Sequence, residues 1–188
     1  MQSKFSLTRR TPYGIRTMGG FSAIELIIVL AILAVLGGVY VFSYDPSNSK
    51  AAALLNLSQE YANAMKRAKT DMSCYPGRMA ALFDQSQANV SPCGDLRTQW
   101  KGRYAELAPA NAAGDIVLNN IGTGATLSIV STADATGTHW FIRSTGVPND
   151  IIARAQNSCN GGAGLTGKCT STAGGAGTGQ FDLEFDLN

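Results

Sequence analysis

The chain has 188 residues, of which 45% are hydrophobic and 15% are charged, and its formal net charge is +2. This length is enough for one domain with a modest core. The excess of positive charge lies in residues 1–20, which contain no acid and four bases: Lys4, Arg9, Arg10 and Arg16. With these four of the 15 basic residues set apart, 11 remain against 13 acids. The balance excludes a broad basic surface for nucleic acid.

A long uncharged segment follows this basic leader. Residues 26–42 read LIIVLAILAVLGGVYVF, and a helix over residues 21–42 would span ~33 Å, enough to cross a bilayer core. The bases before it favour a cytoplasmic N-terminus. An ordinary secretory signal has its small-residue cleavage site after the apolar run, whereas here Gly19-Gly20 precedes the run. We therefore expect residues 1–20 to be removed and the apolar segment to be kept as a transmembrane helix.

The junction Gly20-Phe21-Ser22-Ala23-Ile24-Glu25, followed directly by the apolar segment, resembles the prepilin signature of type IV pilins. The resemblance covers about 25 residues. It implies cleavage after Gly20 by prepilin peptidase, N-methylation of Phe21 and a role for Glu25 in assembly. It also implies storage in the bacterial inner membrane, followed by polymerisation into an extracellular pilus, or fimbrium.

Glu25 is the one charged residue between Phe21 and Phe42. A charge at the centre of a membrane helix costs ~3 kcal/mol, but the first helical turn favours an acid because free N–H groups point there. Cleavage would create an α-amine on Phe21, with an ordinary pKa of ~8. Glu25 can pair with this cation in its own chain or in a neighbour. The alternative is a helix-capping acid on a plain signal anchor.

Two sequence features mark the end of the apolar segment. Glycine weakens a helix interior and proline removes a backbone donor, so Gly37-Gly38 and Asp45-Pro46 predict either a bend or a helix end over residues 37–46. The predicted domains are the cleaved leader (1–20), a transmembrane and assembly helix (21–45) and a periplasmic, later extracellular, pilin head (46–188).

The head is predicted to begin with an amphipathic helix over residues 49–71. Apolar residues recur there every three or four positions, which is typical of one buried helical face. These residues are Leu54, Leu57, Tyr61, Met65, Ala68 and Met72. We expect the face to pack on a sheet. Residues 73–114 read as a turn-rich loop with one short helix near residues 78–85.

Residues 115–188 are predicted to form the sheet and a Cys-bounded C-terminal region. Strand patterns punctuated by glycines occur at residues 115–119, 125–131, 138–143 and 181–188. A short helix is expected between the last two of these strands, with Asn149 as its cap. The fold class is therefore α+β, with a long N-terminal helix packed on an antiparallel sheet of about four strands.

Four cysteines form two pairs in the sequence, Cys74 with Cys93 and Cys159 with Cys169. Neither pair has the close spacing of a zinc site, and there is one histidine in the chain. Two disulfides outside the cytoplasm are therefore expected. Four cysteines allow three connectivities; we favour the two local ones, because each pair brackets a loop-like stretch.

The C-terminal strand alternates apolar and acidic residues. Phe181, Leu183, Phe185 and Leu187 share one predicted face, and Asp182, Glu184 and Asp186 share the other. We expect this acidic face to be solvated. The alternatives are that it binds calcium or meets basic residues of a neighbouring subunit.

Nothing in the sequence indicates catalysis, a cofactor or a bound metal. His139 alternates with apolar residues and is expected on a strand surface, without a recognisable nucleophile. Residues 162–168 fit the start of a phosphate-binding loop, but Cys169 stands where serine or threonine should bind magnesium. We therefore predict a structural subunit and not an enzyme.

The expected partners of such a subunit are identical copies, prepilin peptidase, the assembly machinery of the inner membrane, and a host-cell or surface receptor for adhesion. Two alternatives stay open on the sequence alone. The chain can be a minor pilin or a type II secretion pseudopilin, which share this N-terminus. It can also be a membrane-anchored binding domain that never polymerises.

Overall fold

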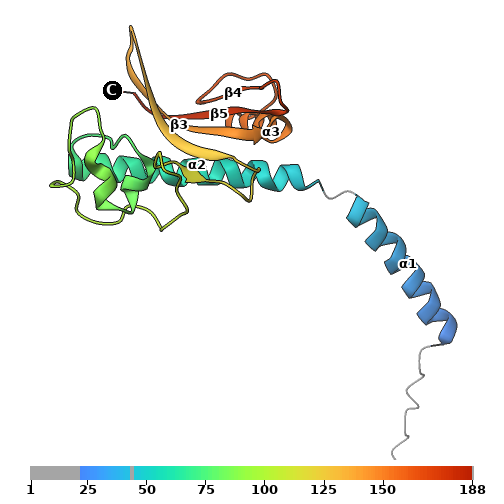
Figure 1. Ribbon diagram of the computed structural model, residues 1–188. Coiled ribbons are helices and arrows are strands. Elements are labelled where there is room, and N and C mark those ends of the chain that lie inside the picture. The colour runs from blue at the N-terminus through green and yellow to red at the C-terminus, as the bar shows by residue number, and fades with distance from the viewer. Residues whose placement is uncertain (1–21, 43–44, 188) are drawn as a thin grey trace, which may run out of the picture. The chain divides into compact units, whose positions relative to one another are not determined.

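The computed structural model describes residues 22–42 and 45–187, with residues 37–42 described by their backbone only. The chain divides into two units, one ending at Tyr44 and the other beginning at Asp45 (Figure 1). Gly20 and Phe21 lie outside the described residues.

The first unit contains one helix, α1 (Ala23–Phe42). It continues through Gly37-Gly38 and ends at Phe42, inside the range 37–46 where a helix end was one of the two predicted outcomes. A glycine costs a helix interior only about 1 kcal/mol relative to alanine, which this helix of 20 residues tolerates. Among residues 22–42 and 45–187, no helix is both long and apolar enough to cross a membrane.

The second unit begins with α2 (Pro46–Met72). The Asp45 carboxylate accepts a hydrogen bond from the Ser47 backbone N–H at 2.9 Å, and Pro46 takes the first helical position, where its missing donor is not needed. Asp45-Pro46 is therefore a start signal, and the helix begins before the predicted residue 49. Most of the predicted apolar stripe is confirmed as buried: Leu54, Tyr61, Met65, Ala68 and Met72.

The sheet has five antiparallel strands in the order β1-β2-β3-β5-β4. The strands are β1 (Ile116–Val117), β2 (Thr126–Asp134), β3 (Gly137–Pro148), β4 (Cys169–Thr172) and β5 (Thr178–Leu187). The four predicted strand regions are confirmed in position. β4 was missed because its sequence, CTST, lies in a glycine-rich stretch and has no apolar alternation.

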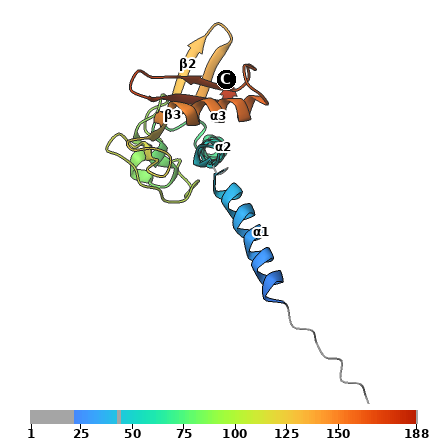
Figure 2. The same cartoon turned by 90° about the vertical axis from the view of Figure 1, so that its right-hand side faces the viewer.

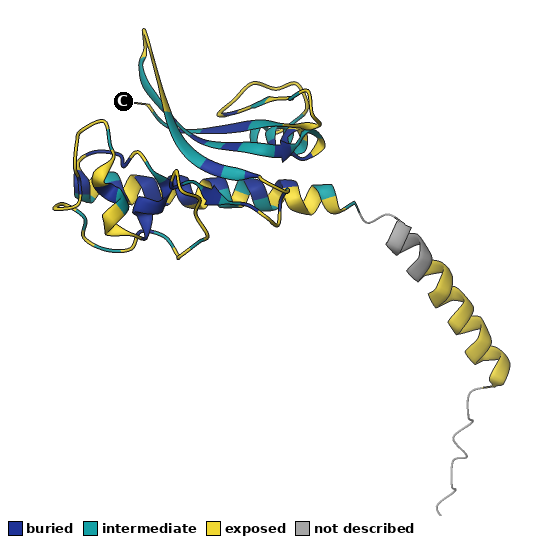
Figure 3. Ribbon diagram, viewed as in Figure 1, coloured by how far each residue is buried: buried dark blue, intermediate teal, exposed yellow. Residues whose placement is uncertain are grey.

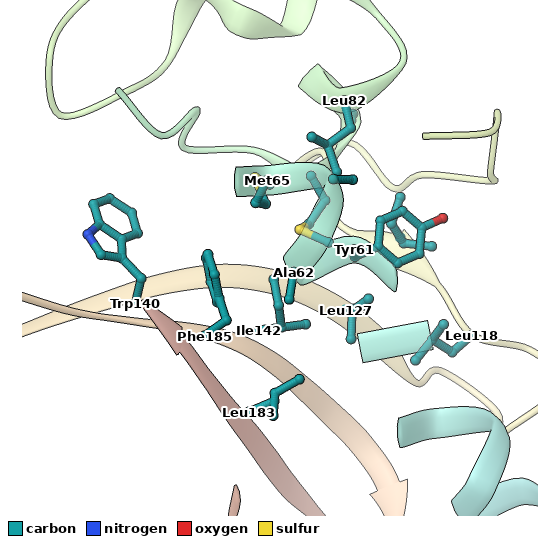
Figure 4. Close-up of a cluster of buried hydrophobic side chains, with 14 of the residues drawn as sticks. Tyr61, Ala62, Met65, Leu82, Leu118, Leu127, Trp140, Ile142, Leu183 and Phe185 are labelled. Carbon is teal, nitrogen blue, oxygen red and sulfur yellow. The ribbon is translucent and has the colours of Figure 1, made fainter. Parts of the chain in front are cut away.

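One face of the sheet is covered by α2 and by α3 (Asn149–Asn160), which lies along β4 and β5 (Figure 2). The core lies between these two layers, where the buried residues gather (Figure 3). Trp140, Ile142 and Leu183 point from the sheet toward Ala62 and Met65 of α2 (Figure 4). The opposite face of the sheet carries polar and charged as well as apolar side chains.

The stretch between α2 and β1 is a compact subdomain and not an open loop. It contains two short 3₁₀ helices, η1 (Met79–Leu82) and η2 (Gln85–Asn89), and η1 overlaps the predicted helix near residues 78–85. The Trp100 indole N–H donates to the Ala81 carbonyl at 2.8 Å, and Arg67 of α2 donates to the Tyr104 carbonyl at 2.7 Å. The first bond holds the subdomain together, and the second attaches it to α2.

Two disulfides hold the second unit together, and both are the local pairings favoured by the sequence. Cys74–Cys93 ties the end of α2 to the segment after η2. Cys159–Cys169 ties the end of α3 to β4.

Asn149 does not cap α3, contrary to the prediction, because Pro148 holds the cap position. The Asn149 side-chain amide instead donates to the Gly174 carbonyl at 3.1 Å and accepts from the Gly174 N–H at 3.2 Å. An asparagine amide carries both a donor and an acceptor, so this side chain pairs with a backbone group as a neighbouring strand would.

Candidate functional site

Glu25 lies in the first turn of α1, and its carboxylate caps the helix. The Ser22 backbone N–H donates to Glu25 Oε2 at 2.9 Å, while the Ile24 N–H lies 3.3 Å from Ser22 Oγ. This reciprocal pair is a capping box, S-x-x-E, which satisfies helical N–H groups that otherwise have no partner. The spacing from Ser22 to Glu25 is the sequence signal that would have revealed it.

The capping contact places the Glu25 carboxylate beside the backbone N–H of the residue that follows Phe21. The α-amine that cleavage would create belongs to the preceding residue, and only a few covalent bonds separate it from this N–H. Capping and pairing with that amine are therefore compatible within one chain, and the two roles are not strict alternatives. Cleavage at Gly20 and methylation of Phe21 concern residues outside the described part of the chain, and they stay predictions.

The rest of α1 exposes apolar side chains in every direction around the helix. Between Ile24 and Leu36 the large ones are 49% to 67% exposed. They are Ile24, Leu26, Ile27, Ile28, Val29, Leu30, Ile32, Leu33, Val35 and Leu36. A helix that is apolar on all sides is typical of one surrounded by lipid or by other helices.

The predicted acidic face of β5 is paired inside the head. Arg143 on β3 lies directly opposite Asp182 in the β3–β5 register, and its Nε and Nη2 each donate to the Asp182 carboxylate at 2.9 Å. Such a two-point contact is among the stronger forms of ion pair. The hydrogen bond to Asp182 raises the pKa of Arg143 although burial acts against it. The expectation of a solvated acidic face is wrong for Asp182, which is 8% exposed.

Asp186 does not share a face with the other two acids. A register shift between Trp140 and Phe141 leaves Phe185 without an opposite residue, and such a bulge turns the chain so that Asp186 faces α2. Its carboxylate lies 2.7 Å from Lys69 Nζ and accepts a hydrogen bond of 2.7 Å from the Tyr75 hydroxyl. The strict alternation that the sequence predicted for this strand therefore ends at the bulge.

Asp186 and Tyr75 both have shifted pKa values. Burial alone would raise the pKa of Asp186, but hydrogen bonds from Lys69 and Tyr75 outweigh it and hold the pKa below its ordinary value. Burial, together with the Asp186 carboxylate, raises the pKa of Tyr75. Asp186 is thus kept ionised against the core, and it stabilises the head only while it is charged.

Replacing Asp186 by asparagine is expected to lower the free energy of unfolding by about 1–3 kcal/mol at pH 7, because a charged hydrogen bond is lost. A carboxyl with a lowered folded pKa stabilises the protein above its unfolded pKa of ~3.9, and this contribution disappears as the pH falls through the folded value. The difference between D186N and wild type should therefore shrink below about pH 4. Denaturant titrations of both detergent-solubilised chains at pH 7 and pH 3 measure this difference in the free energy of unfolding. Asp95→Asn, which breaks an exposed pair with Arg97, should change little at either pH.

His139 lies on the outer face of the sheet, near the turn between β2 and β3. Its Nδ1 is 2.8 Å from Glu184 Oε1, and its Nε2 is 2.8 Å from Thr136 Oγ1 and 3.2 Å from Asp134 Oδ2. The contacts have the outline of a hydroxyl–histidine–acid triad. The Thr136 hydroxyl, however, donates to Asp134 at 2.6 Å, and both ring nitrogens face carboxylates.

These contacts shift the pKa of His139. The hydrogen bond to Glu184 and the charge of Asp134 raise the pKa of His139 despite the opposing effect of burial. A general base must be neutral to accept a proton from a nucleophile, whereas the contacts of His139 with two carboxylates favour its charged, donating form. The geometry therefore suits an ion-pair network, with His139 on a strand surface where the sequence placed it.

The described residues contain no group of three or more histidine, cysteine or acidic side chains arranged to hold a metal ion. Each of the three C-terminal acids has a basic partner within the head, namely Arg143, His139 or Lys69. Neither calcium nor a neighbouring subunit is needed to explain the acidic residues of β5.

The head has several hollows on its surface, and two of them lie beside segments described above. An open groove of about 610 Å³ runs between α2 and residues 103–107. A smaller cavity of about 220 Å³ is lined by Tyr75, Trp140 and the Cys74–Cys93 disulfide. In the described part of the chain, the buried polar side-chain atoms without a hydrogen-bond partner are Trp140 Nε1 and Ser144 Oγ.

No family model matches the chain, and no match is found among the curated proteins or the solved structures.

Proposed function

We propose that the protein is a structural subunit of a type IV pilus, cleaved after Gly20, N-methylated at Phe21 and polymerised through its N-terminal helix. One observation carries this proposal. The prepilin-like junction runs directly into α1, a helix that is capped by Glu25 and exposes apolar side chains on every side.

The exposed apolar side chains of α1 are expected to be buried against lipid or protein. Burying a side chain such as leucine or isoleucine stabilises by about 1.5–3 kcal/mol, so covering the whole helix is strongly favourable. We propose that lipid of the bacterial inner membrane covers α1 before assembly, with the N-terminus in the cytoplasm. In the filament, α1 helices of identical subunits would replace the lipid.

Glu25 would act in both states. In the single subunit it caps α1 through the Ser22 N–H. In the filament, its charge would pair with the Phe21 amine of its own chain or of a neighbour. Helix packing excludes water there, and the low dielectric constant strengthens such a pair.

The head has the properties of an exported domain. Two disulfides are typical of proteins that work outside the cytoplasm, and both are formed here. We propose that the head forms the outer surface of the filament and contacts a host cell or another surface there. Prepilin peptidase and the inner-membrane assembly machinery are the partners that the N-terminus would require. The proposed activity is structural and not enzymatic.

The N-terminal mass of the protein from sheared filaments tests the proposal directly. We expect a chain that begins at Phe21 and carries one added methyl group. Abundance in the sheared fraction identifies a major pilin, and trace amounts identify a minor pilin or a pseudopilin. An intact residue 1–20 leader on a chain absent from the filaments would contradict the proposal and favour the non-polymerising anchor.

A further inference from the structure

The two edges of the sheet differ in how their backbone groups are satisfied. At the β4 edge, the Asn160 amide accepts from the Cys169 N–H at 3.2 Å and donates to the Cys169 carbonyl at 2.9 Å. Asn149 binds Gly174 in the same way just beyond the strand. Two asparagines of α3 thus occupy this edge and block the addition of another strand.

The β2 edge is open over most of its length. β1 pairs only with Thr126 and Leu127, and the Ala125 carbonyl accepts from the Leu118 N–H. From Ser128 to Asp134, no described residue outside β3 hydrogen-bonds to the backbone of β2. Backbone groups alternate in direction along an antiparallel strand. The Ala125 carbonyl points away from β3. The backbone N–H and C=O groups of Ile129, Ser131 and Ala133 therefore also point away from β3.

This open edge lacks the features that usually protect an edge strand. Natural proteins place lysine, proline or inward charges on such strands to prevent pairing with other chains. Residues 126–133 contain no charge and no proline, and Asp134 follows at the turn. Residues 131–134 are exposed, and the β2–β3 hairpin projects beyond the rest of the sheet (Figures 1 and 2).

We propose that the β2 edge binds the β2 edge of a second copy of this chain, antiparallel and centred on Ser131. The β4 edge of a second copy is a poor partner because Asn149 and Asn160 already occupy it. In this register Ser131 lies opposite Ser131 of the second copy, and Ile129 lies opposite Ala133. Each residue whose backbone N–H and C=O point away from β3 is therefore opposite another such residue. Asp134 lies opposite Ser128, which keeps like charges from facing each other.

The contact is short and would be weak between two isolated heads. Interfaces that bury less than about 1,000 Å² are typical of transient association, and seven residues on each side fall in this class. The pairing has two-fold symmetry, so it joins two partners and does not propagate. If the protein forms filaments as proposed above, many heads are presented together, and the contact would link neighbouring filaments through multivalency.

Disulfide trapping in the full chain tests the pairing. All four native cysteines are already in disulfides, so a new cysteine reports only on its own surroundings. Opposed residues of a hydrogen-bonded pair have Cα atoms about 5.5 Å apart, within the range that a disulfide spans. Ser131→Cys in the detergent-solubilised chain should therefore shift from monomer to dimer on non-reducing gels. Thr170→Cys, an exposed position on the blocked β4 edge, should remain monomeric.

The register gives a second test. Val130 lies opposite Thr132 in the proposed pairing, so V130C mixed with T132C should form heterodimers, whereas either variant alone should not dimerise. Adding Ala133→Pro to S131C should abolish the dimer, since proline removes an outward donor and leaves the β3 side intact. Monomers throughout, or dimers of equal yield at Thr170, would overturn the proposal. The experiment needs no filament, so its outcome is separate from that of the proposed function.

Discussion

Gly20→Ala is expected to leave residues 1–20 attached to almost every molecule. A peptidase that cuts after glycine accepts a residue without a side chain before the scissile bond, and a methyl group there obstructs close approach to the backbone. The intact mass should therefore correspond to the full chain, and no N-methylated Phe21 should be found. Without the cut, the amine expected to pair with Glu25 does not exist, and filaments should be lost as well.

Gly19→Ala is the matched control, since it makes the same change one residue further from the cut. It should be processed normally. A mature-sized G20A protein would contradict the assignment of the cleavage site, whereas failure of both variants would point to a general need for flexibility before Phe21.

Glu25→Gln is expected to abolish filaments while leaving cleavage, membrane insertion and the helix intact. Glutamine can take the place of glutamate in a capping box, since its side-chain oxygen still accepts from the Ser22 N–H. The variant therefore keeps the cap observed at 2.9 Å and loses only the charge. Intact mass, carbonate extraction of membranes and the yield of sheared filaments measure the three properties.

Ser22→Ala makes the opposite change. It removes the hydroxyl from the cap, at a cost of about 0.5–2 kcal/mol, and it keeps the charge of Glu25. Filaments should persist in S22A. Normal filaments from E25Q, together with poor filaments from S22A, would show that Glu25 acts as a cap and not as a charge in assembly.

Much of the fold follows from local patterns in the sequence. The apolar stripe of α2, the positions of four strands and the two local disulfides were all predictable, because each depends on spacing along one segment. The start of α2 was predicted at residue 49 and not at Pro46 for a different reason. Asp45-Pro46 can end one helix or begin another, and which role wins depends on the residues that follow.

The remaining differences arise from contacts between distant segments. The acidic residues of β5 were expected on one solvated face because alternation was assumed to continue. The bulge at Phe185 depends on the register with β3, which no pattern within β5 reveals. Asn149 and Asn160 likewise take their roles from backbone groups of the glycine-rich stretch, 25 residues away for Asn149 and nine for Asn160. The capping box at the start of α1, in contrast, depends on four consecutive residues and could have been predicted from the sequence.

The Cys159–Cys169 disulfide bears on how the protein would survive outside a cell. Residues 161–168 are rich in glycine and mostly exposed, which is typical of segments that proteases cut. A single cut there would leave both new ends joined through the disulfide, and β4 would remain paired with β5. A nicked head would therefore stay in one piece, and a cut in this exposed segment would not release a strand from the sheet.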